Sequence, residues 1–190
     1  MVSIHALRAK LALAAICVGA GLALGASSSG VGSGKAAVWH PVWREVKWPF
    51  SGDPWGPGKA YICRAADCGA EARIYLRAKM GLCNCATGIE DDADLDRMGD
   101  LYLLGGDVVP SGAGRQIVVG QMKGRSRAYA LKGPQEAYRT AITIGYSDRC
   151  DMVVATGILQ RERQDATEPA ILEFLNSPAV LRWTETTLGL

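Results

Sequence analysis

The clearest sign of the architecture is residues 72–82, Ala-Arg-Ile-Tyr-Leu-Arg-Ala-Lys-Met-Gly-Leu. Apolar side chains alternate with basic or aromatic ones, and this period of two predicts a β-strand with one apolar and one basic face. We expect the apolar face to meet the core. The basic face, which carries Arg73, Arg77 and Lys79, is expected to be exposed and available to a ligand.

Downstream of this strand the pattern changes to a helical period. Leu95, Met98 and Leu101 recur on one side of residues 91–104, acids occupy the first turn, and Gly105-Gly106 follows. This arrangement predicts one amphipathic helix with a favourable charge at its N-terminus.

The second half of the chain predicts paired strands followed by helices. Segments 115–122 and 125–131, divided by Lys123-Gly124, are expected to form one hairpin. Segments 140–146 and 150–158 are expected to form another. In the tail, Thr167 is expected to cap a first helix and Ser177-Pro178 to start a second.

This order of elements predicts an α+β fold. We expect an antiparallel sheet of about five to six strands, with one mid-chain helix and a C-terminal helical segment packed on it. The closing order of hairpin and then helix resembles that of PsbP and Mog1-type modules over about half the chain. The resemblance concerns the fold and implies no functional residues.

The N-terminus has the layout of a secretory signal peptide. His5, Arg8 and Lys10 precede an apolar run from Leu11 to Leu24, which is shorter than the roughly 20 residues needed to span a bilayer. We therefore expect a signal peptide over 1–25, a flexible leader over 26–37 and a single domain over 38–190. The expected location is the periplasm or the exterior, with no stable membrane insertion after cleavage.

Charge argues against nucleic acid as a partner. Loss of Arg8 and Lys10 from 21 basic residues leaves a balance with the 19 acidic ones, and a neutral domain has no general attraction for polyanions. The remaining charges are segregated, since residues 86–107 are mainly acidic and residues 108–149 mainly basic. Pairing within the chain and a dipolar surface that orients a partner both explain this pattern.

A tryptophan-rich segment, residues 38–55, is the second ligand-binding candidate. Its prolines and glycines forbid a long helix or strand. Aromatic side chains in such a segment either clamp it to the core or form a platform for a ligand. The four tryptophans concerned are Trp39, Trp43, Trp48 and Trp55.

The cysteines left after signal cleavage are five: Cys63, Cys68, Cys83, Cys85 and Cys150. In an oxidising compartment an odd set forms at most two disulfides and leaves one thiol. Cys63 and Cys68 flank a short turn and are the favoured pair. Cys150 is expected to bond to Cys83 or Cys85, because closing that loop of roughly 65 residues stabilises the fold by about 4 kcal/mol.

The Cys-Asn-Cys motif has an alternative interpretation. Cys83 and Cys85 lie two residues apart and would present two thiolates on one face of a strand. Such a pair suits Cu(I) or thiol-disulfide exchange. Otherwise we expect no cofactor.

No motif in the chain predicts a reaction. His40 is the single histidine outside the expected signal peptide, and no triad signature surrounds it. Asp92, Asp94 and Asp96 imitate the start of a calcium loop, but Arg97 and Leu103 occupy positions that require glycine and glutamate. An enzyme is therefore the less favoured interpretation.

Residues 75–104, which include Cys83-Asn84-Cys85-Ala86-Thr87-Gly88, resemble uncharacterised small secreted proteins of alphaproteobacteria. The resemblance covers about a third of the chain. It implies an exported protein and no particular activity. We therefore expect an exported, disulfide-stapled domain that binds a protein or a small ligand, with a copper-binding or thiol-redox accessory protein as the alternative.

Overall fold

The computed structural model describes residues 41–51, 55–81, 89–132, 139–148, 150–159 and 164–190. All of them belong to one compact unit, Val38–Leu190. The expected signal peptide (1–25) and leader (26–37) lie outside the described residues. Within the described part, none of the helices combines the length and apolarity needed to cross a bilayer.

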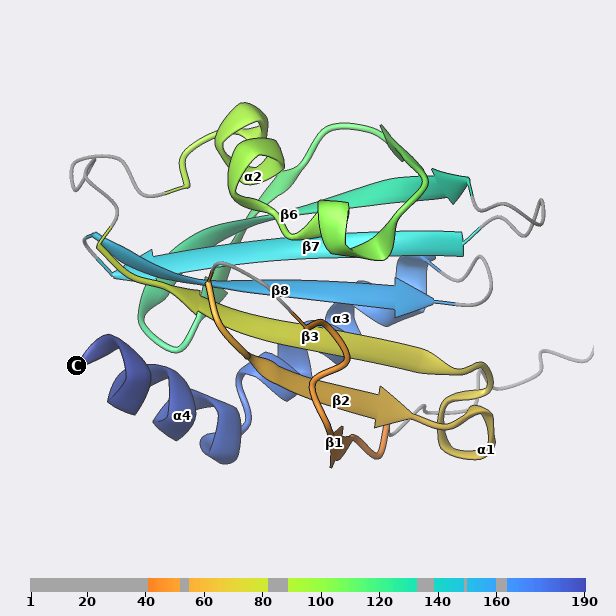
Figure 1. Ribbon diagram of the computed structural model, residues 1–190, viewed down its shortest axis with the longest axis horizontal. Coiled ribbons are helices and arrows are strands. Elements are labelled where there is room, and N and C mark those ends of the chain that lie inside the picture. Colours follow the sequence, from red (N-terminus) through yellow and green to blue (C-terminus); the bar gives the residue numbers. More distant parts are fainter. Residues whose placement is uncertain (1–40, 52–54, 82–88, 133–138, 149, 160–163) are drawn as a thin grey trace, which may run out of the picture. The chain divides into compact units, whose positions relative to one another are not determined.

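The domain is built on one antiparallel sheet, which confirms the predicted α+β class (Figure 1). The order along the sheet is β1-β2-β3-β8-β7-β6-β4, and β5 pairs with the same edge of β6 as β4. The sheet has eight strands, more than the five to six expected. They are β1 (Arg44–Val46), β2 (Lys59–Cys63), β3 (Ala72–Lys79), β4 (Asp107–Pro110), β5 (Arg115–Val119), β6 (Met122–Lys132), β7 (Arg139–Asp148) and β8 (Asp151–Leu159).

Helices cover both faces of this sheet. The first α-helix, α1 (Ala65–Cys68), joins β2 to β3. On one face lie α2 (Asp92–Met98) and the 3-10 helix η1 (Leu101–Leu104). On the other lie α3 (Gln164–Leu175) and α4 (Pro178–Leu188), with α3 passing behind the sheet in Figure 1. We call these the α2 face and the α3/α4 face.

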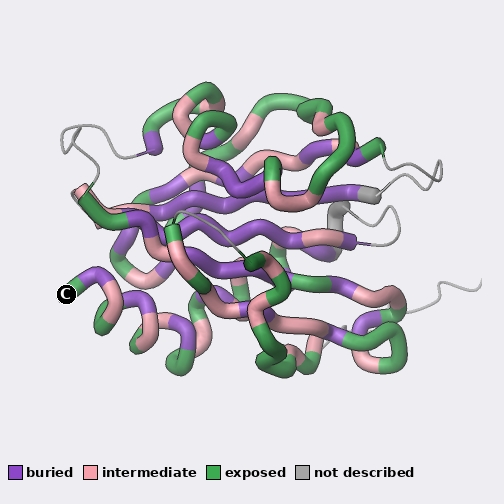
Figure 2. The backbone as a smooth tube through the Cα atoms, in the orientation of Figure 1, coloured by how far each residue is buried: buried purple, intermediate pink, exposed green. Residues whose placement is uncertain are grey.

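The alternation of β3 decides how the two faces are filled. Ile74 and Leu76 are fully buried in the core of the α3/α4 face, together with Ile144 of β7 and Val153 of β8. The main cluster on the α2 face is smaller and includes Leu95 and Val154. The central strands are consequently buried on both sides, as the colouring of Figure 2 shows.

Two element boundaries differ from the prediction, and a glycine is involved at each. The β5–β6 turn falls at Gly120-Gln121, where Gly120 has a φ of +59°, rather than at Lys123-Gly124. Gly124 instead lies inside β6, where an added Cβ would be 2.2 Å from the carbonyl oxygen of Gly145. The predicted 91–104 helix also divides, because Gly99 adopts an extended conformation between α2 and η1.

The C-terminal helices were predicted with mixed success. Ser177 is the N-cap residue of α4 and Pro178 its first residue, as expected. Thr167, however, lies inside α3, which begins at Gln164, and is 1% exposed. Strands β2 and β4 were not predicted, because both are short and β4 ends at a proline that cannot donate a ladder hydrogen bond.

Candidate functional site

The basic face of β3 is not open to solvent at two of its three cations. Arg77 and Lys79 are 1% and 3% exposed, respectively, whereas Arg73 is exposed and forms an ion pair with Glu71. The expectation of an exposed basic face was therefore wrong for Arg77 and Lys79. The physical reason is that the turn from α2 into η1 covers this part of the sheet.

A buried carboxylate accounts for both cations. Asp100, 3% exposed, lies between α2 and η1. Its Oδ2 is 3.4 Å from Arg77 Nε, and its Oδ1 is 2.9 Å from Lys79 Nζ. Lys79 also donates to the carbonyl oxygen of Met98 at 2.6 Å, and Arg77 donates to the Tyr102 hydroxyl at 3.2 Å. These contacts hold α2 and η1 against β3.

Two tryptophans contact these cations. The Arg77 guanidinium lies 5.0 Å from the centre of the Trp48 ring, and Lys79 Nζ lies 5.4 Å from that of Trp55. Both distances fall within the range of cation–π contacts. Trp48 and Trp55 therefore join the N-terminal segment to the α2 face.

The tryptophan-rich segment does not form one platform. Trp43 packs against the other face of the sheet, where its ring centre is 5.3 Å from that of Phe174 in α3. Trp48 instead lies 6.0 Å from Tyr75 and 5.4 Å from Phe50, both in edge-on geometry. Trp39 lies outside the described residues. The segment thus packs against both faces of the sheet, near the edge formed by β1.

Beside Trp48 there is a groove of about 320 Å³, which we call the β1 groove. It lies between the segment that follows β1 and strands β2 and β3. Its lining is almost entirely apolar. It is lined by Val46, Lys47, Pro49, Tyr61, Ile62, Arg73 and Tyr75.

Few polar atoms line the β1 groove, and its charged side chains, Lys47 and Arg73, are exposed at its rim. The hydroxyl of Tyr61 is engaged by Glu45, and burial, followed by that carboxylate, raises the pKa of Tyr61 to about 12. The Glu71 carboxylate and, less strongly, a hydrogen bond with Tyr75 raise the pKa of Arg73. Lys47 is exposed. The rim of the groove therefore carries one ammonium group and one guanidinium group, beside the Tyr75 side chain.

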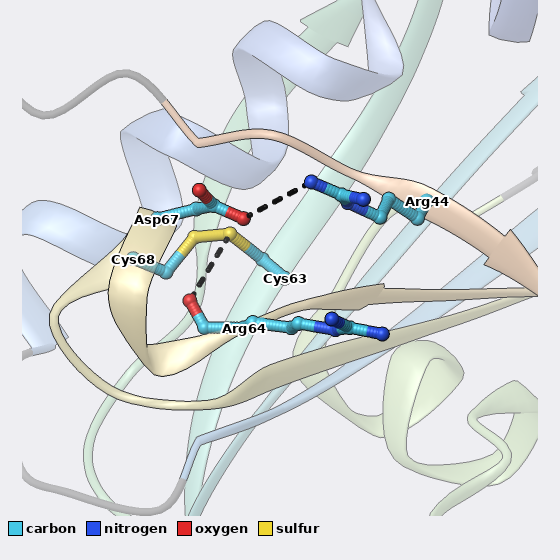
Figure 3. The surroundings of a disulfide bond; sticks show 5 residues. All are labelled: Arg44, Cys63, Arg64, Asp67 and Cys68. Carbon is cyan, nitrogen blue, oxygen red and sulfur yellow. Dashed lines mark hydrogen bonds and ion pairs between the residues drawn. A yellow bond between two sulfur atoms is a disulfide. The ribbon is translucent and has the colours of Figure 1, made fainter.

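The disulfide at α1 stabilises the end of β2 next to this groove. The structure joins Cys63 and Cys68, whose Cα atoms are 5.9 Å apart, and both residues are buried (Figure 3). Nearby, Arg44 of β1 forms an ion pair of 3.7 Å with Asp67 of α1. Cys150 is disulfide-bonded as well, and its expected partners, Cys83 and Cys85, lie outside the described residues.

The acidic run pairs with the basic run inside the molecule. Asp92 of α2 contacts Arg125 of β6, and Asp96 Oδ2 is 2.7 Å from Nη1 of Arg127. Tyr129 also donates to Asp96 at 2.5 Å. Of the two explanations for the segregated charges, pairing within the chain is the one observed for these residues.

The contacts of Asp92, Asp94 and Asp96 explain why these acids resemble the start of a calcium loop but serve another purpose. Asp94 donates its N–H to the N-cap residue Asp91, and its carboxylate accepts from the Glu90 N–H and pairs with Arg97. Asp92 and Asp96 contact arginines of β6. No cluster of three metal-ligating side chains occurs in the described ranges. The proposed Cu(I) ligands Cys83 and Cys85 are outside those ranges.

Three important residues were not singled out from the sequence. Asp100 looked like one more acid of the acidic run, although its place directly after Gly99 marks a break between helices. Ile62 lies in a short strand that was missed, and Tyr75 was assigned only to the alternating pattern of β3. Tyr75 lies on the basic face of β3, Ile62 pairs with Arg73 across it and Asp100 covers it, so their roles could be found only from the strand pairing and the packing of α2 and η1.

Comparisons with known proteins add little to this description. No family model matches the chain, and no curated protein matches it. One solved structure with a similar arrangement is a protein of unknown function, PA94, from Pseudomonas aeruginosa, described as a putative regulator. It is 12% identical with a TM-score of 0.37, and the match covers 75% of this chain and 85% of that one.

Proposed function

We propose that this chain is an exported, disulfide-stapled, non-enzymatic binding domain whose ligand occupies the β1 groove. The ligand is a segment of a protein or a small molecule. The single observation that supports the proposal is the groove itself, which is bounded by the residues after β1 on one side and by Arg73 and Tyr75 of β3 on the other. Both regions were singled out as ligand-binding candidates by their sequence.

The surroundings of the groove support a preformed site. Trp48, Phe50 and Tyr75 form a compact aromatic cluster, in which the Phe50 and Tyr75 ring centres are 4.9 Å apart. On the opposite face Tyr61 packs edge-on against Phe174 at 4.8 Å. A rigid apolar lining with a few oriented polar groups is typical of small-ligand sites.

Ligand-observed NMR with a library of small fragments tests this proposal. Ile62 belongs to the groove lining, so Ile62→Trp should fill the groove and abolish most of the binding seen with the unaltered protein. Val118→Trp is the matched control, because Val118 is 59% exposed on β5 at the other edge of the sheet. Fragment binding that survives Ile62→Trp unchanged would contradict the assignment of the site.

Free-thiol counting on the exported chain separates this proposal from the copper-binding or thiol-redox alternative. The binding domain is expected to contain two disulfides and one inaccessible thiol. The alternative, which uses Cys83 and Cys85, requires two reactive thiols or one bound Cu(I) per chain. Intact-mass measurement before and after reduction and alkylation gives the thiol count and the processed N-terminus together.

A further inference from the structure

We infer that the β1 groove binds a small apolar monocarboxylate, in which a hydrocarbon or aromatic body carries one carboxylate group. This inference rests on the proposed function and names the chemical class of its ligand. It follows from the polarity of the lining, the charge at its rim and the nature of the neighbouring sheet edge.

The first argument is the inventory of polar groups. Glu71 Oε1 accepts from both Nε and Nη2 of Arg73 at 2.9 Å, so Nη1 takes no part in that ion pair. Guanidinium and ammonium groups can only donate hydrogen bonds. The rim of the groove, which carries the exposed Arg73 and Lys47, therefore offers donors to a ligand, and a ligand that fits them supplies acceptors.

The second argument is charge. Arg73 and Glu71 compensate each other, whereas Lys47 has no acidic partner within the described residues. The net charge of the groove and its immediate rim is consequently positive. A single anionic group complements it, and a carboxylate is a suitable acceptor for an ammonium group and a guanidinium group.

The third argument concerns the body of the ligand. Val46, Pro49 and Ile62 provide an apolar wall, and the volume of about 320 Å³ is at the lower end of the range for small-molecule sites. Transfer of an apolar body from water to this wall is favourable in proportion to the area buried. A ligand without an apolar part would gain no favourable free energy from contact with this wall.

The fourth argument favours a small molecule over an extended peptide. A peptide could add to the outer edge of β1, but this strand has only three residues and carries Arg44 and Glu45. Pro41 and Pro49 flank it. Short length, charge and proline are the features by which natural sheets discourage pairing at an edge.

Isothermal titration calorimetry on the mature, oxidised chain tests the inference with three probes of equal length: octanoate, octanol and octylammonium, each below its aggregation concentration. We expect octanoate to bind at least ten times more tightly than octanol, and octylammonium to bind least. Equal binding of octanoate and octanol would overturn the carboxylate assignment while leaving the groove as a binding site. If none of the three binds, the small-ligand assignment is overturned.

Two surface variants locate the charge effect without altering the core. Lys47→Gln should weaken octanoate binding about five-fold or more and leave octanol binding unchanged. Lys123→Gln, at another exposed lysine on β6, should change neither. An equal loss with both variants would show a general charge effect and contradict the proposal. Binding of an apolar peptide by its C-terminal carboxylate, without octanoate binding, would also contradict it.

Discussion

At the scale of single residues, Asp100 holds the turn between α2 and η1 to β3. Its carboxylate is buried and contacts two buried cations of β3, Arg77 and Lys79, on the α2 face of the sheet. Charges removed from water cost several kcal/mol unless they are paired and hydrogen-bonded. The arrangement therefore depends on the contacts of the Asp100 carboxylate with both cations.

Replacement of Asp100 by asparagine should lower the free energy of unfolding by about 3–5 kcal/mol, because Arg77 and Lys79 lose the carboxylate that both contact. Chemical denaturation followed by circular dichroism measures this change. Asp107→Asn, at an exposed position of β4, serves as the control and should change stability by less than about 0.5 kcal/mol. A similarly small effect of Asp100→Asn would contradict the stabilising role of the contacts that Asp100 makes with Arg77 and Lys79.

At the scale of elements, Asp92 and Asp96 hold α2 to β6, and Asp92 also contacts the loop before β5. Its Oδ2 accepts from the backbone N–H of Gly114 at 2.9 Å, and its other oxygen contacts Arg125. The hydrogen bond from Gly114, and then Arg125, lower the pKa of the Asp92 carboxyl below its ordinary value of 3.8. The ionised carboxylate thus belongs to the folded state.

This lowered pKa has a consequence for pH dependence. The unfolded chain takes up a proton at Asp92 before the folded chain does, so the stabilisation is complete above the ordinary value and is lost as pH falls through the lowered one. Asp92→Asn should therefore destabilise the protein at pH 7, and the difference from wild type should shrink between about pH 5 and pH 2. Urea unfolding at several pH values measures it.

Glu173→Gln is the matched control for that series. Glu173 is exposed on α3, and its substitution should leave the pH dependence of unfolding close to that of wild type. A constant difference between Asp92→Asn and wild type over the whole pH range would contradict the electrostatic role of Asp92.

The α1 disulfide acts on the same scale. It closes a loop with a sequence separation of five residues, so the chain-entropy model gives a stabilisation of about 2 kcal/mol. The double variant Cys63→Ala, Cys68→Ala should lose about that amount in equilibrium unfolding, plus the cost of two small cavities. No loss of stability would show that α1 is held by its other contacts alone, including Arg44 with Asp67.

The elements that could be predicted are those whose own residues show the periodicity. The alternation of residues 72–82 identified β3, and the Ser177-Pro178 start identified α4, because both signals are local. The break at Gly99 and the turn at Gly120 could not be located, since Gly99 packs against Thr143 of β7 and the Gly120 N–H donates to Asn176, which follows α3. The burial of Arg77 and Lys79 was missed for the same reason: alternation identifies two faces but not what covers them.

At the scale of the whole domain, both faces of the sheet are occupied, one by α2 and η1 and the other by α3 and α4. The central strands are buried on both sides. Near the β1 edge, the segment after β1 and the aromatic cluster of Trp48, Phe50 and Tyr75 leave an apolar groove within reach of solvent. We therefore propose that ligand binding takes place at this edge.

Methyl-resolved NMR of the mature chain, titrated with octanoate, tests that placement most directly. The methyl groups of Val46 and Ile62 should shift progressively and saturate together, while those of Val109 and Val118, exposed at the opposite edge, should remain unchanged. Saturable shifts confined to Val109 and Val118, or equal small shifts at all four residues, would contradict a binding site in the β1 groove.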